Sequence, residues 1–381
     1  MAGIYIHIPF CRKACYYCNF HFSTSLQSLE KMVEALHVEV RLRKSYINQP
    51  VETIYFGGGT PSLLSINHLK SIISAIHTHY NVSSTAEITL EANPDDINTL
   101  TLQSWKEAGI NRLSIGVQSF FDDELQWMNR NHTAQQSLKC IKQAQDNGFE
   151  NISIDLIYGT PSLTEQQWMQ ILQTATSLNI PHLSCYALTV EEKTALSEMI
   201  KKKTSSPVNT DSQAEQFLKL IDFLTMKGYE HYEISNFSKP GWRSKHNTSY
   251  WLGKTYLGIG PSAHSFNKTS RQWNIANNAL YIKAIQQKTI PYTIEQLTLT
   301  QQLNEYIMIA LRTMEGLDLN YIVNNWGKEY AIALKEHIPL LQQNGWIEKN
   351  LSNKIILSSQ GKLRADGIAT MLFFDEEKQK L

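Results

Sequence analysis

Residues 5–20, YIHIPFCRKACYYCNF, join a short run of β-forming apolar residues to a loop rich in cysteine. The cysteines follow the spacing Cys11-x3-Cys15-x2-Cys18, so three of the five in the chain fall within eight residues. A small, odd number of cysteines crowded into one loop is typical of a ligand site and not of a disulfide framework. The stretch therefore predicts a strand that ends in a metal-binding loop.

Three thiolates close together in sequence can hold three irons of a cubane cluster. The fourth iron then lacks a protein ligand, whereas an electron-transfer cluster normally has four cysteines. An iron without a protein ligand is a binding site, and we expect one here. Two alternatives stay open from the spacing: a structural zinc site with a fourth ligand such as His21, or three incidental thiols.

Apolar β-rich runs recur after this stretch, with amphipathic helical segments between them. Six strands are expected, at residues 3–8, 52–56, 86–90, 112–117, 151–157 and 183–188. Helices are expected at residues 28–46, 66–80, 97–108, 134–147 and 165–178, several of which end at Gly or Asn. Strand alternating with helix implies right-handed crossovers and a parallel sheet buried on both faces. Six such units predict either an incomplete barrel or a doubly wound sheet.

Polar and glycine residues at the strand ends decide between these two folds. They follow or close all six strands, at residues 9–18, 57–62 (GGGTPS), 91–94 (EANP), 118–119, 155–159 and 186–187. A doubly wound sheet gathers ligand residues near one switch point, whereas a barrel collects them from the carboxyl ends of all its strands. The distribution favours an α/β fold with a partial (β/α)6 barrel of the TIM type.

We expect three units along the chain. Residues 1–228 form the barrel, with a polar linker at 189–210 and a helix from the N-cap Asp211 to residue 227. Residues 229–295 lack clean periodicity and are expected to be an accessory segment packed on the barrel. Residues 296–381 begin with a helix at 301–314 capped by Thr300, and a β-ribbon at 345–357 suggests a small winged-helix-like domain. The residues after Thr300 carry nine Lys and Arg against ten Asp and Glu, so a structural role is favoured over DNA binding.

Composition excludes several classes of protein. The chain of 381 residues is 42% hydrophobic and carries 35 Lys and Arg against 35 Asp and Glu. Disorder is excluded, and the balanced charge argues against a nucleic-acid binder with a broad basic surface. No run approaches the roughly 20 apolar residues of a membrane span. The N-terminal apolar stretch is too short and carries too little charge for a secretory signal. We expect a soluble, cytoplasmic protein.

The cysteine spacing and the GGGTPS block resemble the radical S-adenosylmethionine (SAM) superfamily. The blocks YIHIPFC, GGGTPS, IGVQSF, IDLIYGTP and GIGPSAHS are similar to its coproporphyrinogen III oxidase-like (HemN-like) branch over nearly the whole chain. The resemblance implies a six-unit partial TIM barrel and a [4Fe-4S] cluster on Cys11, Cys15 and Cys18. It also implies that SAM binds the open iron through its amino and carboxylate groups.

The same resemblance implies which residues contact SAM. They are Tyr5 in the first strand, the glycine motif Gly57, Gly58, Gly59 and Thr60, the charged Glu91 and Arg130, Gln118 and Asp155 at the ribose, and Tyr186 and Ala187 beside the adenine. The residue types suit these roles, because glycines let backbone carbonyls approach an ammonium and an arginine fork suits a carboxylate. A tight turn is the plainer interpretation of the glycines, and a buried structural acid that of Asp155.

Two departures separate the chain from the oxidases of this branch. The oxidases carry a further cysteine at the position of Phe20, and they have an N-terminal extension that is not expected here. Both departures are shared with a sister group of haem chaperones, the HemW group. That group also carries a His-Asn-x-x-Tyr-Trp motif, which residues 246–251 fit without a gap.

The motif can also be assessed without the resemblance. An imidazole is a normal axial haem ligand, and aromatic rings offer flat apolar surface to a porphyrin. His246 would share a helix face with Tyr250. The plainer interpretation is an aromatic packing cluster with a hydrogen-bonded histidine. His264 has no firm role, and Cys140 and Cys185 are expected to be packed core thiols.

The favoured hypothesis is a haem chaperone that binds haem, a [4Fe-4S] cluster and SAM. The resemblance implies acceptor haemoproteins, membrane-bound respiratory enzymes among them, and an electron donor as partners. The alternative is an oxygen-independent coproporphyrinogen III oxidase, a radical SAM oxidoreductase that decarboxylates propionate side chains. A winged-helix regulator with a sensing cluster is a third hypothesis, which the neutral C-terminal charge disfavours.

Overall fold

The computed structural model describes residues 2–348 and 353–375. At its centre is a sheet of 12 strands in the order β12-β11-β10-β9-β1-β2-β3-β4-β5-β6-β8-β7. The six expected strands are neighbours in it and run parallel: β1 (Ala2–Ile8), β2 (Val51–Gly58), β3 (Val82–Ala92), β4 (Arg112–Gln118), β5 (Ile152–Tyr158) and β6 (His182–Ala187). The predicted α/β fold with a partial parallel barrel is confirmed.

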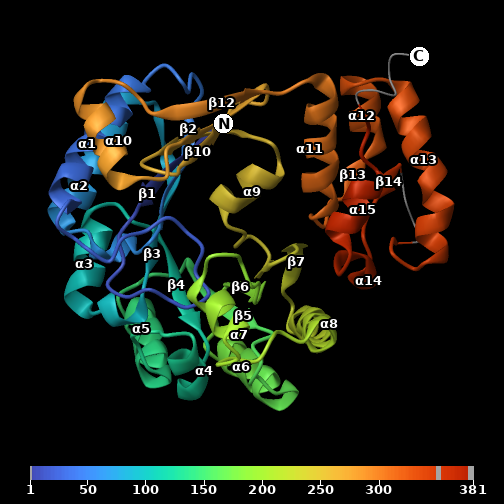
Figure 1. Ribbon diagram of the computed structural model, residues 1–381, viewed down its shortest axis with the longest axis horizontal. Helices are drawn as coiled ribbons and strands as arrows, with labels where there is room; N and C mark the ends of the chain where they lie inside the picture. The colour runs from blue at the N-terminus through green and yellow to red at the C-terminus, as the bar shows by residue number, and fades with distance from the viewer. Residues whose placement is uncertain (1, 349–352, 376–381) are drawn as a thin grey trace.

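Helices cover the outer face of the parallel strands (Figure 1). They are α1 (Leu29–Leu42), α2 (Ile66–His79), α3 (Thr99–Glu107), α4 (Asp122–Trp127), α5 (Ala134–Asp146) and α6 (Glu165–Ser177). Helices α3, α5 and α6 begin with capping boxes at Asn98, Thr133 and Thr164. In each box the cap side chain accepts a hydrogen bond from the backbone of the third helical residue, and the side chain of that residue accepts one from the backbone of the cap. The strands are buried almost continuously, as parallel strands covered on both faces must be.

The segment at residues 229–295 extends the barrel sheet at both edges. On one side β9 (Thr255–Ile259) runs parallel to β1, followed by the antiparallel strands β10 (His264–Phe266), β11 (Ser270–Asn274) and β12 (Tyr292–Gln296). On the other side β8 (Asn236–Ser238) and β7 (Glu230–Glu233) follow β6. The segment also carries α9 (Lys245–Trp251) and α10 (Asn278–Gln286). These residues therefore continue the sheet and do not only pack on it.

Helix positions differ from expectation in several places, beginning with α4, which was not expected. The polar stretch at 189–210 contains α7 (Ala195–Lys201), and α8 (Thr210–Met226) is capped by Asn209, two residues before the expected cap. The helix α11 (Leu299–Leu311) is capped by Thr298 and not by Thr300. Only Thr298 has a glutamine three residues later, Gln301, which completes a capping box.

The C-terminal residues have a hydrophobic core of their own. After α11 come β13 (Leu317–Asp318), α12 (Leu319–Asn325), α13 (Lys328–Gln343), β14 (Lys354–Ile355), α14 (Ser359–Lys362) and α15 (Ala365–Met371). Strands β13 and β14 pair antiparallel, and Ile347 forms an isolated bridge to Leu357. The middle of the expected ribbon, at 349–352, lies outside the described residues, and the winged-helix-like arrangement stays a prediction.

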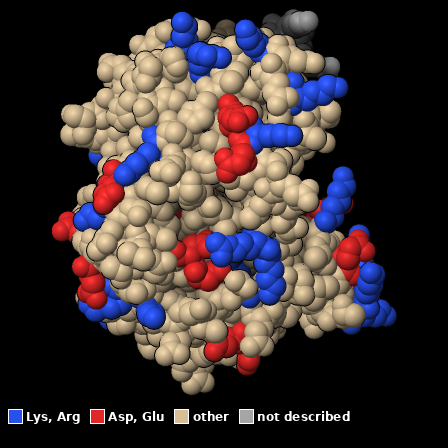
Figure 2. Space-filling model, turned by 90° about the vertical axis from the view of Figure 1, so that its left-hand side faces the viewer, with Lys and Arg blue, Asp and Glu red and all other residues tan. Residues whose placement is uncertain are grey.

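Acidic and basic side chains are interspersed on the face shown in Figure 2, where no broad patch of one sign is visible. This pattern agrees with the equal numbers of acidic and basic residues in the sequence. Of the helices in residues 2–348 and 353–375, none is long and apolar enough to cross a bilayer.

Candidate cluster and cofactor site

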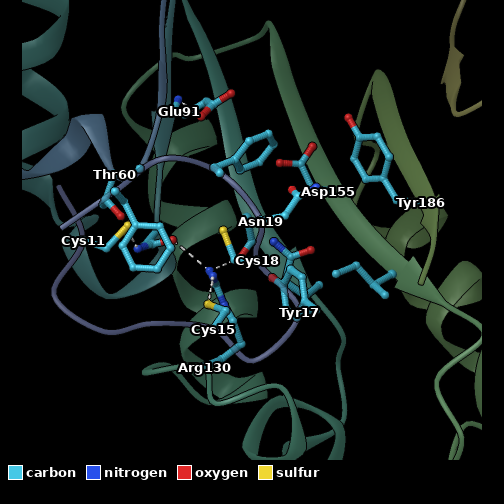
Figure 3. Close-up of a pocket in the computed structure, with 18 of the residues that line it drawn as sticks. Cys11, Cys15, Tyr17, Cys18, Asn19, Thr60, Glu91, Arg130, Asp155 and Tyr186 are labelled. Atoms are coloured by element: carbon cyan, nitrogen blue, oxygen red, sulfur yellow. Dashed lines mark hydrogen bonds between the residues drawn. The ribbon is translucent and has the colours of Figure 1, made fainter. Parts of the chain in front are cut away.

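A cavity of about 340 Å³ opens where the parallel strands end. It brings together most of the predicted site residues, several of them labelled in Figure 3. These are Cys11, Cys15, Cys18, Gly58, Gly59, Thr60, Glu91, Gln118, Arg130, Asp155, Tyr186 and Ala187. Residues from all six parallel strands or the loops after them therefore meet in one space, as the barrel prediction requires.

The three cysteines of the loop after β1 are free and half-buried. The Cys11 amide donates to the Ser23 carbonyl at 3.0 Å, and the Cys18 amide donates to the Cys15 carbonyl at 3.3 Å, so the loop is folded back on itself. Burial raises the pKa of the Cys11 thiol to about 11 and raises that of Cys18. Bound iron would counteract this rise in pKa, because the positive charge of the metal stabilises the deprotonated thiol.

The donor arrangement fits a cluster better than a single zinc ion. Among the described residues, no three His, Cys, Asp or Glu side chains converge on one metal-sized point. His21, the candidate fourth zinc ligand, uses its Nε2 on Asn278 Oδ1 at 2.8 Å. Thiolates on separate irons of a cubane need not converge on one point. A [4Fe-4S] cluster with an open iron would supply one-electron chemistry and a site for the amino-acid end of SAM.

Arg130 ties the cysteine loop to the barrel. Its Nη1 donates to Cys15 Sγ at 3.3 Å, and its Nη2 donates to Asn93 Oδ1 and to the Gly116 carbonyl, both at 2.8 Å (Figure 3). Its Nε is buried and has no partner within the described part of the chain. Arg130 therefore supplies positive charge beside the cysteine sulfur, in addition to the SAM contact expected for it.

The glycine motif at the end of β2 is required by close packing. A side chain on Gly59 would lie 2.6 Å from the Phe10 carbonyl oxygen, and Gly58 has a φ of +108°. The Gly58 amide donates to Glu91 Oε2 at 3.2 Å. The motif thus lets the cysteine loop and β2 approach each other and leaves room for a ligand above the turn.

Two half-buried carboxylates, those of Glu91 and Asp155, lie in the cavity. Burial, and next the charge of Asp155, raise the pKa of Glu91 to about 7, although Glu91 accepts a hydrogen bond from the Tyr55 hydroxyl at 2.8 Å. Burial also raises the pKa of Asp155 to about 6, against the lowering effect of the Ser184 and Ser114 hydroxyls. Two half-buried acids with raised pKa values are suited to a cationic, hydroxyl-bearing ligand, which SAM is.

Gln118 and Tyr186 complete the cavity. Gln118 ends β4 in the left-handed region, with a φ of +67°, a conformation that a non-glycine residue adopts at a cost. Tyr186 at the end of β6 exposes 41% of its surface although it follows a buried strand. An exposed aromatic residue beside a cavity offers a flat surface to a ring such as adenine.

Three predicted site residues lie elsewhere. Tyr5 and Gly57 do not line this cavity: Tyr5 lines a neighbouring one, and Gly57 lies against the Tyr5 and Glu91 side chains. His246 is 2% exposed, and both of its ring nitrogens are bonded, Nδ1 to Thr53 Oγ1 and Nε2 to the Tyr250 hydroxyl, each at 2.8 Å. A histidine so enclosed has no unbonded ring nitrogen in this structure, so the geometry does not favour it as a haem ligand, and the expected role stays a prediction.

Other residues of the cavity were not singled out from the sequence. Asn93 lines it from directly after β3, Ser114 from within β4, and Tyr17 from within the cysteine loop. Asn93 had a signal, since it lies in the EANP stretch at a strand end. Tyr17 had one too, as the aromatic residue directly before the third cysteine. Its contribution depends on how the loop folds, which local sequence does not determine.

The profile of the Radical SAM superfamily matches residues 5–175. "Heme chaperone HemW" of Bacillus subtilis is 35% identical over 95% of this chain and 97% of its own length. "Heme chaperone HemW" of Mycobacterium tuberculosis strain H37Rv is 30% identical, over 97% of this chain and 94% of its own. This chain belongs to the HemW family. A solved structure of coproporphyrinogen III oxidase (HemN) from Escherichia coli has a TM-score of 0.83 at 23% identity, covering 98% of this chain and 90% of that one.

Membership of the HemW family and the cavity agree with each other. Radical SAM proteins hold a [4Fe-4S] cluster and SAM, and the cavity offers three free thiols and two half-buried carboxylates. The likeness to HemN confirms the fold that HemW and HemN proteins share. Phe20, where oxidases carry a further cysteine, lines the cavity and is 65% exposed.

Proposed function

We propose that this chain is a haem chaperone that binds haem, holds a [4Fe-4S] cluster with SAM, and passes the haem to acceptor haemoproteins. The observation that carries the proposal is the likeness to HemW over 95% of the chain at 35% identity. The cavity supports it, because its residues suit the cluster and the cofactor of the family. Five free cysteines suit a reducing compartment, so we place the protein in the cytoplasm.

Within this proposal Cys11, Cys15 and Cys18 hold three irons of the cluster. Glu91 and the backbone of Gly58 contact the amino group of SAM, since a carboxylate and carbonyl oxygens both suit an ammonium. Other cavity residues are assigned as follows: Arg130 to the carboxylate of SAM, Gln118 and Asp155 to its ribose, and Tyr186 and Ala187 to its adenine. An electron donor that reduces the cluster and haemoproteins that receive the haem, membrane-bound respiratory enzymes among them, are the proposed partners.

The chaperone and oxidase functions differ in what happens to a tetrapyrrole. A decarboxylase needs its substrate's propionates close to SAM and shielded from water. Here Phe20 takes the place of the oxidases' further cysteine and is exposed at the cavity edge. The likeness to HemN at 23% identity concerns architecture and does not favour the oxidase activity.

One anaerobic preparation, reconstituted with iron and sulfide, tests the proposal. Haem titration should give saturable binding with a Soret band distinct from that of free haem. Incubation with coproporphyrinogen III, SAM and dithionite should give no decarboxylated product by chromatography. Adding SAM should perturb the paramagnetic resonance spectrum of the reduced cluster. Decarboxylated product, or a protein that does not bind haem, would overturn the proposal.

A further inference from the structure

A second cavity, of about 590 Å³, lies beside the cluster cavity and shares Asn19 and Phe20 with it. Its walls come from β1, the loop after the cysteines, α9, the strands β9 to β11, and α11. Its volume falls within the range of about 300–1,000 Å³ that is usual for cofactor pockets. The motif residues Tyr250 and Trp251 line it.

We propose that haem binds in this second cavity and that the imidazole of His264, not that of His246, is the axial ligand of its iron. The assignment rests on the proposed haem-binding function. It adds the location of the haem and the residue that supplies the axial ligand. His264 is the first residue of β10 and lines the cavity.

Hydrogen bonds distinguish the histidines of this cavity. Both ring nitrogens of His7 are engaged, by the Tyr5 hydroxyl at 3.2 Å and by the His21 carbonyl at 2.9 Å. His21 is half-buried and uses its Nε2 on Asn278 at 2.8 Å, so it keeps only its Nδ1 for another partner. The ring of His264 is exposed, and neither of its nitrogens has a hydrogen bond within residues 2–348 and 353–375. An axial ligand needs a free, accessible nitrogen, and His264 offers two.

The surroundings of His264 also favour coordination. Its ring stacks against that of Trp273, its cross-strand partner on β11, with centroids 6.1 Å apart and planes 26° apart. Partial burial, and then the charge of Arg271, lower the pKa of His264. The neutral imidazole is the form that binds a metal, so these surroundings keep the ring ready for iron.

Aromatic rings form one wall of the cavity. Tyr250 meets Tyr256 edge to face at 4.5 Å between centroids, and Tyr256 lies 6.0 Å from Phe266. Trp251 adds a fourth ring, and its indole nitrogen is buried without a partner in the described part of the chain. A flat apolar macrocycle is the kind of ligand that such a wall suits.

His246 has a positioning role in this arrangement. It lies beneath the wall, between Thr53 Oγ1 and the Tyr250 hydroxyl, and its ring meets that of Tyr250 edge to face. It therefore fixes the ring of Tyr250 without reaching the cavity itself. The His-Asn-x-x-Tyr-Trp motif thus contributes through Tyr250 and Trp251, and His246 holds them in place.

Arg271 provides the charge that a haem propionate requires. It lines the cavity from β11, and one of its nitrogens, Nη2, donates to Glu305 Oε1 at 2.5 Å. Its side chain is 36% exposed, so its remaining donors can reach a carboxylate at the rim. The cavity therefore combines an aromatic wall, a free imidazole and a cation, which are three features of a haem site.

The test uses the full chain, anaerobically reconstituted, with ferric haem as the probe. Wild-type protein should give the spectrum of a histidine-ligated haem. His264→Ala should lose that spectrum and raise the Kd by about tenfold or more, and added imidazole should restore the spectrum. His246→Gln should keep the spectrum and weaken binding less, because the ligand is intact. His77→Ala, an exposed histidine of α2 outside both cavities, is the matched control and should behave as wild type.

The outcomes separate this inference from the function on which it rests. A wild-type protein that binds no haem would overturn the proposed function. Wild-type binding together with an unchanged spectrum and Kd in His264→Ala would overturn the ligand assignment and leave the function standing. Loss of the histidine-ligated spectrum in His246→Gln, with iron content and circular dichroism unchanged, would return the ligand role to His246.

Discussion

The two half-buried acids of the cluster cavity, Glu91 and Asp155, make the stability of the protein depend on pH. Burial raises the pKa of Asp155 from 3.8 to about 6 and that of Glu91 from 4.5 to about 7. Each acid then binds a proton more readily in the folded protein than in the unfolded chain. The free energy of unfolding should therefore fall as pH rises through these two intervals and stay lower above pH 7. A bound cation such as SAM would offset this loss.

Asp155→Asn should consequently stabilise the cluster-free protein, and only at pH values where the acid is ionised in the unfolded chain. At pH 8 the variant should gain about 1–3 kcal/mol, because the cost of desolvating the carboxylate is removed. At pH 3, where Asp155 is protonated in the folded and the unfolded protein alike, the gain should be small. Thermal unfolding followed by circular dichroism at both pH values measures the difference. An equal gain at pH 3 and pH 8 would show that charge is not the cause. The same variant should respond more weakly to SAM.

The cysteine loop gives a prediction with internal controls. Cys11→Ala, Cys15→Ala and Cys18→Ala should each remove most of the iron and of the charge-transfer absorption after reconstitution. Cys140→Ala and Cys185→Ala should keep both, because these thiols are buried in the hydrophobic core away from the cavity. Iron and acid-labile sulfide analysis checks the set. A Cys15→Ala protein that still holds a full complement of iron would contradict the assignment.

At single residues, the sequence predicts the chemistry of a side chain better than it predicts which cavity the side chain lines. The cysteine spacing and the strand-end acids carry their chemistry in their type and place, and the structure brings them into one cavity. Tyr5 was predicted to contact SAM but lines the neighbouring cavity, and His246 was predicted as a haem ligand but has both ring nitrogens bonded. The enclosure of His246 depends on Thr53, nearly 200 residues earlier, and a pairing over that separation leaves no local signal.

At the scale of elements, one buried network joins the first helix to the end of the sheet. Glu39 of α1 accepts hydrogen bonds from Arg43, from the Gly260 amide at 2.8 Å and from the Tyr281 hydroxyl at 2.5 Å. Arg43 in turn donates to Asn274 at 2.8 Å. The segment at 229–295 is thus fastened to the barrel by side chains as well as by strand pairing.

Glu39→Ala should destabilise the protein by about 3–5 kcal/mol, because it leaves the buried Arg43 guanidinium without its counter-ion. Glu30→Ala on the same helix is the matched control: Glu30 is exposed, and its contact with His68 should contribute less than about 1 kcal/mol. Chemical denaturation of the two variants beside wild type measures the difference. Equal effects would show that the network does not hold the two segments together.

Helices and parallel strands of the barrel could be predicted from the sequence, and the added strands could not. The six barrel strands are six or more residues long and carry apolar stretches, as strands buried on both faces tend to. Strands β7 to β12 have three to five residues and mix aromatic with polar side chains, so neither apolar runs nor alternation marks them. Their pairing is decided by the free edges of β1 and β6, which are tertiary features.

At the scale of the whole molecule, two cavities share one wall and draw on different units. The cluster cavity is built from the barrel and the cysteine loop, whereas the second cavity also takes Glu305 and Ile309 from α11. That helix belongs to the C-terminal core, so this unit closes one side of the proposed haem site. The balanced charge of the C-terminal residues favoured a structural role. Their position beside the second cavity agrees with such a role (Figure 1).

The ion pair between Arg271 and Glu305 in the second cavity predicts how haem affinity changes when either residue is replaced. Glu305 of α11 holds one nitrogen of Arg271, and it would compete with a haem propionate for this guanidinium. Glu305→Gln should therefore strengthen haem binding, by about two- to fivefold, since partly exposed ion pairs contribute up to about 1 kcal/mol. Arg271→Gln should weaken binding by a similar factor, and neither change should alter iron content. Haem titrations at low and at high salt measure both effects. Weaker binding in Glu305→Gln would mean that the pair stabilises the wall and that the propionate does not reach Arg271.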